Sequence, residues 1–307
     1  MIKGKMLLSV CIMATVLLIA LAGSVWAQSA GPSSTLKERV GKLVFFDKNL
    51  SDPPGQACAA CHSPEVGWTG PDPATNINGG VYEGAVKGHF GNRKPPAAAY
   101  AGDSPALSYV EDVGWVGGMF WDGRATGETL GDPLAEQAQG PFLNPLEQNN
   151  ADAQAVCLKV KKASYAGMFK AAWGPDALDC EKDAAGVYEK IARSIAAFER
   201  SSEVSAYTSK FDAYLLEGEK LTPQEDLGLK LFEGKAKCAS GHPARTEDGE
   251  PLPFTDFTYD NLGLPKNPMN PFYGEPDSNP AEAGWVVTRL AELLGWHRDA
   301  GLSSDSP

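Results

Sequence analysis

The sequence is short of positive charge and of strand-like patterns. Its 307 residues carry 27 Lys and Arg against 39 Asp and Glu, which gives a formal net charge of −12. Such an acidic chain is a poor match for nucleic acid or for an anionic lipid surface, because their phosphates attract cations. Alternation of apolar and polar residues is scarce, and this favours an all-α fold over a sheet. The hydrophobic content of 43% suits a globular protein.

No second long apolar run follows the one at the N-terminus. Lys3 and Lys5 precede an apolar stretch over 6–23, which ends near Val25-Trp26-Ala27. A positive start, an apolar stretch and small residues before a cleavage point are typical of a secretory signal peptide, here 1–27. The pattern predicts export, to the periplasm in a Gram-negative source. An uncleaved membrane anchor is the alternative, since the stretch is close to the length that spans a bilayer.

Cysteines are few, and their number is odd once the leader is set aside. Of the six, Cys11 lies in the leader, and five remain: Cys58, Cys61, Cys157, Cys180 and Cys238. In an oxidising compartment an odd number means that at least one cysteine has another role. We predict a disulfide between Cys157 and Cys180, which lie in helix-like sequence and would close a loop. Two free thiols are the alternative.

The motif with the most specific chemistry is Cys58-Ala59-Ala60-Cys61-His62. C-x-x-C-H attaches c-type haem: both thiols form thioethers with the haem vinyl groups, and the histidine ligates the iron. A zinc knuckle would need two further ligands nearby, and a thioredoxin-like pair would follow a strand and open a helix. The sequence shows neither context. We therefore predict haem c at Cys58 and Cys61, with His62 as the iron ligand.

A weak internal repeat indicates a second site of the same kind. GKLVFFD at 41–47 leads into the first motif, and GLKLFEG at 228–234 leads into Cys238-Ala239-Ser240-Gly241-His242. Both lead-in segments are predicted to be helices, because Thr35 with Glu38 and Thr222 with Glu225 each form a capping box. The repeat suggests two haem domains in tandem.

The second motif lacks one of the two cysteines. Cys238 and His242 are present, but Gly241 stands where the second thioether cysteine would be. A haem held by one thioether, with His242 on its iron, is one interpretation. A site that receives no haem is the other.

Between the motifs the sequence predicts helix and long loops. Val187, Ile191, Ile195 and Phe198 recur at helical spacing and define an amphipathic helix that ends at Arg200. Pro, Gly and Asn cluster at 70–105 and 262–280, which indicates ordered loops of the kind that wrap a cofactor.

Seven segments, in this order, resemble the bacterial di-haem cytochrome c peroxidase and MauG family. They are GKLVFFD (41–47), CAACH (58–62), GNRKPP (91–96), FWDGRA (120–125), EQAQGP (136–141), NPLE (144–147) and AAFER (196–200). FWDGRA between two haem motifs is rather specific, and the other segments are individually weak. The resemblance covers roughly residues 36–275.

The resemblance implies an all-α protein of two tandem cytochrome-c-like domains with long loops and little β-structure. The first, 28–205, would hold the peroxidatic haem, and the second, 206–307, the altered motif. The implied activity is reduction of hydrogen peroxide to water with electrons from a small cytochrome or copper protein. MauG-like oxidation of a protein side chain is one alternative, and a haem-binding electron carrier with only the first haem is another. The family also implies a calcium ion, and a homodimer is compatible with it.

The resemblance also assigns roles around the first haem. Glu147 falls where the family has its distal carboxylate, Gln137 where it has a hydrogen-bonding partner, and Trp121 where a tryptophan lies between the haems. The alternatives are a solvated loop acid, a surface residue and a core side chain. Arg93 and Arg124 could neutralise haem propionates or form structural ion pairs.

Further ligands are expected from loops. His89 precedes an Arg-x-x-Pro segment, as does a displaceable distal histidine of the first haem in many family members; a surface loop histidine is the alternative. The family brings Met or Tyr to the second haem from a C-terminal loop, but 285–307 does not match it and predicts an amphipathic helix with a polar tail. Met269 and His297 are the candidates to replace that ligand, although the interpretation that neither is a ligand is favoured.

Overall fold

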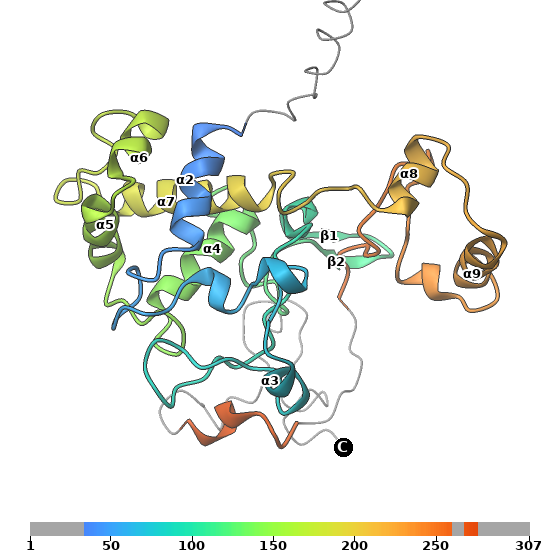
Figure 1. The fold of residues 1–307 in the computed structure, drawn as a ribbon, viewed down its shortest axis with the longest axis horizontal. Helices are drawn as coiled ribbons and strands as arrows, with labels where there is room; N and C mark the ends of the chain where they lie inside the picture. Colours follow the sequence, from blue (N-terminus) through green and yellow to red (C-terminus); the bar gives the residue numbers. More distant parts are fainter. Residues whose placement is uncertain (1–33, 260–266, 276–307) are drawn as a thin grey trace, which may run out of the picture. The chain divides into compact units, whose positions relative to one another are not determined.

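Helices make up most of the regular structure in the computed structural model (Figure 1), which describes residues 34–259 and 267–275. The helices are α2 (Leu36–Phe45), α3 (Pro73–Ile77), α4 (Pro133–Leu143), α5 (Ala153–Lys162), α6 (Ala166–Trp173), α7 (Ala184–Glu199), α8 (Lys210–Leu216) and α9 (Pro223–Glu233). Strands β1 (Ser108–Val110) and β2 (Gly114–Val116) pair antiparallel, with Tyr109 opposite Trp115. The prediction of a mostly helical fold with little β-structure is confirmed for the described residues.

Short 3₁₀ turns carry both sequence motifs. The turns are η1 (Cys58–Ala60), η2 (Pro64–Val66), η3 (Ala101–Asp103), η4 (Cys238–Ser240) and η5 (Pro271–Gly274). The described residues from Leu36 onward belong to one compact unit. The predicted signal peptide, His297 and the predicted C-terminal helix lie outside the described residues. Within the described ranges, none of the helices is both long and apolar enough to cross a membrane.

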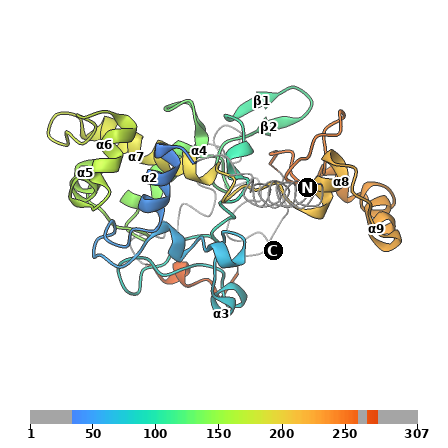
Figure 2. The same cartoon turned by 45° about the horizontal axis from the view of Figure 1, so that its top comes forward.

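The main core lies where α2 packs against α7. α7 also contacts α4 and α5, and α6 lies against α2 and α5, as both views show (Figure 1 and Figure 2). Val40, Val44 and Phe45 of α2 are fully buried against the apolar face of α7. Burying each such side chain contributes roughly 1.5–3 kcal/mol. The predicted helix face is confirmed: Val187, Ile191, Ile195 and Phe198 are all buried, and Arg200 caps the helix.

A disulfide fastens α5 to the segment before α7. Cys157 and Cys180, 23 residues apart, are bonded and buried in this same core, so the predicted pairing is confirmed. Closing a loop of this length stabilises the folded state by about 3 kcal/mol, mainly by restricting the unfolded chain.

The close approach of α2 to α7 depends on Gly41. A Cβ at this position would overlap the carbonyl oxygen of Ser194, a backbone atom of α7 that cannot turn away. We expect Gly41→Ala to lower the free energy of unfolding by about 3 kcal/mol, because the two helices must separate. Denaturant unfolding of the haem-loaded chain measures this.

Gly228 provides the matched control, because it occupies the same position of the internal repeat in α9. A Cβ there meets nothing within 4 Å. Gly228→Ala should therefore leave stability unchanged or raise it by up to about 1 kcal/mol, the helix preference for Ala over Gly. Equal losses in the two variants would contradict the proposed helix contact.

The part of the chain that holds the second motif is thinly packed. Thr222 and Glu225 form the predicted capping box and Pro223 opens α9, yet no residue of that helix is buried. Of residues 206–259, all described, only Ala244 is buried. The chain is nevertheless tied back to the β-hairpin, since Gly117 N donates to Phe257 O (2.9 Å) and Tyr259 Oη donates to Gly117 O (2.6 Å).

Candidate functional site

The first motif faces a cleft with about 970 Å³ of empty space, open solvent included. Several parts of the chain meet there: the η1 turn, the loop 82–96, the turn 120–124, α4 with the residues that follow it, and the ends of α2 and α7. The predicted residues that line it are Cys58, Cys61, His62, Arg93, Trp121, Arg124, Gln137 and Glu147. His89, Cys238 and His242 do not line it.

The η1 turn fixes the orientation of His62. The backbone N–H groups of Cys61 and His62 both donate to the carbonyl of Cys58 (3.1 and 3.0 Å). The Nδ1 atom of His62 lies 3.3 Å from the carbonyl oxygen of Trp68, which occupies a left-handed backbone conformation (φ 62°). Nδ1 therefore carries the proton toward this carbonyl and leaves the lone pair on Nε2.

The surroundings of His62 keep its imidazole neutral. Burial lowers the pKa of His62, while the carbonyl groups of Trp68 and Pro96 act in the opposite direction. A neutral imidazole oriented through Nδ1 is the state that binds a metal.

The two thiols of the motif are also held neutral. Both are free, and burial in the cleft raises the pKa of each to about 12. The amide nitrogen of Gln148 lies 3.8 Å from Cys58 Sγ, and that of Gln56 lies 4.0 Å from Cys61 Sγ. In the described chain the side-chain oxygens of both glutamines are buried without a hydrogen-bond partner.

This donor set fits haem c better than a bare metal ion. Two free thiols and an oriented imidazole line one cleft, and these are the groups that attach a porphyrin and ligate its iron. Over the residues that the structure describes, no three His, Cys, Asp or Glu side chains gather into a group that could hold a metal ion. Calcium therefore stays a prediction.

Glu147 lies in the cleft at the end of a tight turn after α4. Its backbone carbonyl accepts a hydrogen bond from Ala85 N (2.7 Å), which ties the turn to the loop 82–96. Burial raises the pKa of the Glu147 carboxyl, partly offset by the charge of Arg124 and by a hydrogen bond with Asn144. The carboxyl therefore holds a proton more readily than a solvated loop acid would.

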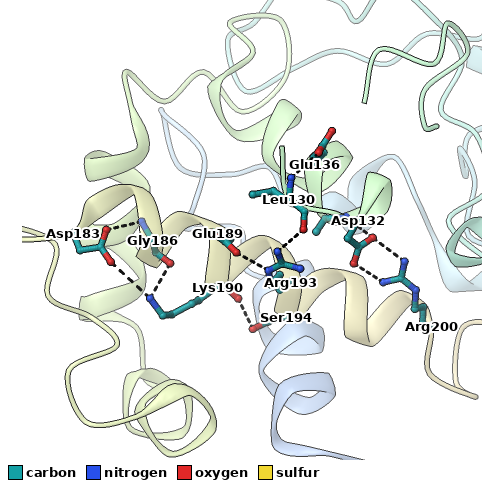
Figure 3. Close-up of polar contacts among 11 residues, drawn as sticks. Leu130, Asp132, Glu136, Asp183, Gly186, Glu189, Lys190, Arg193, Ser194 and Arg200 are labelled. Atoms are coloured by element: carbon teal, nitrogen blue, oxygen red, sulfur yellow. Dashed lines mark hydrogen bonds and ion pairs between the residues drawn. The ribbon is translucent and has the colours of Figure 1, made fainter. Parts of the chain in front are cut away.

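The position of Gln137 is set by contacts between α7 and the start of α4 (Figure 3). The Arg200 guanidinium donates to both carboxylate oxygens of Asp132 (2.8 and 2.9 Å), and Asp132 caps α4 through Leu134 N and Ala135 N. Arg193 donates to the carbonyl of Leu130 (2.6 Å) in the loop before α4. Two arginines of one helix thus hold the helix that carries Gln137.

Asp122 forms ion pairs with two arginines at the cleft. Its carboxylate accepts from Arg93 (2.8 Å) and Arg124 (2.9 Å), and the Arg124 guanidinium lies 3.5 Å from the Phe120 ring centroid. The predicted structural ion pairs are therefore present, and both cations still line the cleft.

Trp121 is not a core residue. Its side chain is 57% exposed, and its indole N–H donates to the carbonyl of Lys94 (2.8 Å). This bond fixes the ring at the cleft without burying it.

His89 lies beside Glu275 and is not among the residues that line the cleft. Its Nδ1 lies 3.4 Å from Glu275 Oε2, and the second oxygen of Glu275 accepts from Phe90 N (2.8 Å). Ligation of iron by His89 stays a prediction. Met269, in the same C-terminal segment, is 58% exposed, and its role as a ligand is likewise untested.

One functional candidate escaped the sequence analysis. Glu199 is 5% exposed and lines the cleft from the end of α7. Burial raises its pKa to about 8; Arg200 lowers it and Asp132 adds to the rise. A signal was present, because Glu199 follows Ile195 by four residues and so lies on the apolar face. Gln56 and Gln148 gave no comparable signal.

A mostly helical chain with C-x-x-C-H beside such a cleft has the site of a c-type haem protein. The particular family is equally clear: the sequence model of the di-haem cytochrome c peroxidase family matches residues 35–220, and the chain belongs to that family. The resemblance seen in the sequence is confirmed, and the protein is an oxidoreductase family member.

The relatives include both MauG proteins and cytochrome c peroxidases. The chain is 34% identical over 265 residues to the methylamine utilization protein MauG of Paracoccus denitrificans (strain Pd 1222), covering 85% of this chain and 65% of the relative. It is 28% identical over 266 residues to the cytochrome c551 peroxidase of Nitrosomonas europaea, covering 85% and 66%. The diheme peroxidase BthA from Burkholderia thailandensis E264 superposes with a TM-score of 0.68 at 30% identity, over 87% of this chain and 63% of that one. The chain thus spans just under two thirds of the length of these relatives.

Proposed function

We propose that this protein reduces hydrogen peroxide to water in the cleft beside His62, with electrons from a small redox protein. The observation that carries the proposal is the convergence of Cys58, Cys61, His62 and Glu147 on one cleft. Haem c, bound to the two cysteines and to Nε2 of His62, would supply the redox chemistry.

Glu147 and Gln137 supply the proton handling. Reducing one peroxide to two waters consumes two electrons and two protons, and one oxygen must gain a proton as the O–O bond breaks. A carboxyl with a raised pKa can take a proton from one peroxide oxygen and return it to the other. The Gln137 amide, on the fixed helix α4, can orient peroxide by hydrogen bonding.

The remaining predicted residues hold the cofactor and connect the site to its donor. Arg93 and Arg124, fixed by Asp122, would neutralise the haem propionates. Trp121, exposed and anchored to Lys94, would relay electrons at the cleft. The net charge of −12 favours a basic cytochrome or copper protein as the donor, and the leader sequence supports a periplasmic location.

Oxidation of a side chain of another protein is the second candidate. It is favoured by the 34% identity to a methylamine utilization protein MauG and by the exposure of Trp121. An exposed indole at the cleft could pass oxidising equivalents to a docked protein as well as accept electrons from a donor.

Peroxide consumption by the haem-loaded full chain distinguishes these functions. With a reduced small cytochrome as donor, we expect two donor molecules to be oxidised per peroxide, and no consumption by Cys58→Ala/Cys61→Ala. A haem that is reduced and reoxidised normally without consuming peroxide would instead indicate an electron carrier. Peroxide-dependent oxidation of a protein partner without a donor would indicate the MauG-like activity.

A further inference from the structure

The altered second motif keeps the backbone geometry of the first. The N–H groups of Gly241 and His242 donate to the carbonyl of Cys238 (3.3 and 3.0 Å), as those of Cys61 and His62 do to Cys58. η4 has the length and position of η1, and each is the turn that begins at the first cysteine of its motif.

The contact between the histidine Nδ1 and a backbone carbonyl, which orients the ring, is also repeated. Nδ1 of His242 lies 3.0 Å from the carbonyl oxygen of Phe254, the counterpart of the contact between His62 and Trp68. Phe254 and Trp68 share a left-handed backbone conformation (φ 58° and 62°). The proton of His242 is thereby directed to Nδ1, and Nε2 is left free for a metal.

The aromatic contact behind the histidine is repeated as well. Phe232 holds in the second lead-in helix the place that Phe45 holds in the first. Its ring lies 5.7 Å from that of Phe254 at 82°, and the ring of Phe45 lies 5.9 Å from that of Trp68 at 74°. The turn, the aromatic pair and the oriented imidazole of the first motif are thus all present in the second. Their joint presence favours a motif that still binds its cofactor.

Gly241 differs from Cys61 in its side chain and not in its backbone. The two residues have similar angles (φ −121°, ψ −7° and φ −108°, ψ −15°). A Cβ at Gly241 would meet nothing within 4 Å. Only one attachment point is missing from the second motif.

We propose that the second motif binds a haem through a single thioether to Cys238, with Nε2 of His242 on its iron. The Cys238 thiol is free and exposed. It would add across one vinyl group: Sγ bonds the carbon next to the ring, and the thiol hydrogen goes to the terminal carbon. The addition needs no oxidant or reductant, and the other vinyl group stays intact.

The sparse packing of this region is consistent with a porphyrin as the missing contact. Leu227 and Leu231 on α9 and Phe254 are 58%, 45% and 44% exposed. These apolar side chains lie on the segments that carry the motif, where a flat apolar cofactor would cover them. The inference deepens the proposed function, because it concerns the second haem of the same protein.

The test is the number, location and type of covalent haems on the full chain, produced in a host that attaches c-type haem. We expect the denatured wild-type chain to have the mass of two added haems, mapped to the peptides that contain 58–62 and 238–242. Cys238→Ala should carry one, on the first peptide. In the reduced pyridine haemochrome spectrum, one intact vinyl group should shift part of the α band to longer wavelength.

Two matched variants make the result specific. Gly241→Cys should keep two haems and shift the α band to shorter wavelength, because the last vinyl group is consumed. Cys61→Gly gives the first motif the pattern of the second. It should shift the α band to longer wavelength, because one more vinyl group stays intact.

A wild-type chain with haem on 58–62 alone would overturn the proposal, and so would a second haem that appears only in Gly241→Cys. Failure of the proposed function looks different: it is loss of haem from 58–62, or peroxide inactivity of a chain with both haems.

Discussion

Glu147→Gln should slow peroxide turnover by about 10²- to 10⁴-fold, the usual contribution of a positioned acid–base group. The amide has nearly the shape of the carboxyl but cannot accept a proton from peroxide and return it. Covalent haem content should not change, because Cys58, Cys61 and His62 are all retained. The measurement is kcat/KM for peroxide with a reduced small cytochrome.

Glu65→Gln is the control for this variant. Glu65 is exposed on η2, close to the first motif in sequence, and does not line the cleft. Its loss of one negative charge should leave turnover near the wild-type value. If the Glu147 and Glu65 variants had similar rates, the acid–base role of Glu147 would be ruled out.

Glu199 should make the protein less stable as pH rises. Its pKa moves from an ordinary 4.5 to about 8 on folding, so between these values the folded state binds the extra proton. This contribution to stability is full below about pH 4.5, falls by up to about 1.4 kcal/mol per pH unit between 4.5 and 8, and is gone above 8. The total is about 5 kcal/mol at most. Glu199→Gln cannot ionise and should show a flatter profile over this window.

Guanidinium unfolding of the haem-loaded chain at several pH values tests this expectation. Glu189→Gln is the control, since it also removes one carboxylate from α7, where the side chain is 39% exposed. Subtracting the stability profile of Glu189→Gln from that of Glu199→Gln cancels the contributions of the other titrating groups. Parallel profiles for Glu199→Gln and wild type would show that the carboxyl is solvated or paired in the haem-loaded protein.

Local patterns predicted the parts of this molecule well. The first motif, the apolar face of α7 and the capping box of α9 each depend on residues close together in sequence, where spacing and chemistry determine the result. The disulfide also followed from cysteine number and its helical surroundings. The helix, the capping box and the disulfide are confirmed, whereas the attachment of haem at the first motif stays a prediction.

Distant contacts account for what could not be predicted. His89 lies beside Glu275, 186 residues further along the chain, so its position outside the cleft lining left no trace in the local sequence. The cleft itself depends on Arg200 reaching Asp132 on another helix. The buried glutamines beside the thiols are unremarkable in sequence, because only the fold brings them to the cysteines.

The C-terminal segment 267–275 makes the first cleft dependent on the end of the described chain. Asn270 donates to the carbonyl of Asn92 (3.1 Å), and Glu275 accepts from Phe90 N, on either side of Gly91 in the loop that carries Arg93. The chain reaches this loop only after passing through the second motif. A proteolytic cut after Tyr259 would therefore separate this supporting segment from the rest of the chain while sparing every residue that lines the cleft. Cleavage after Tyr259 is thus expected to loosen a site whose lining residues all lie earlier in the chain.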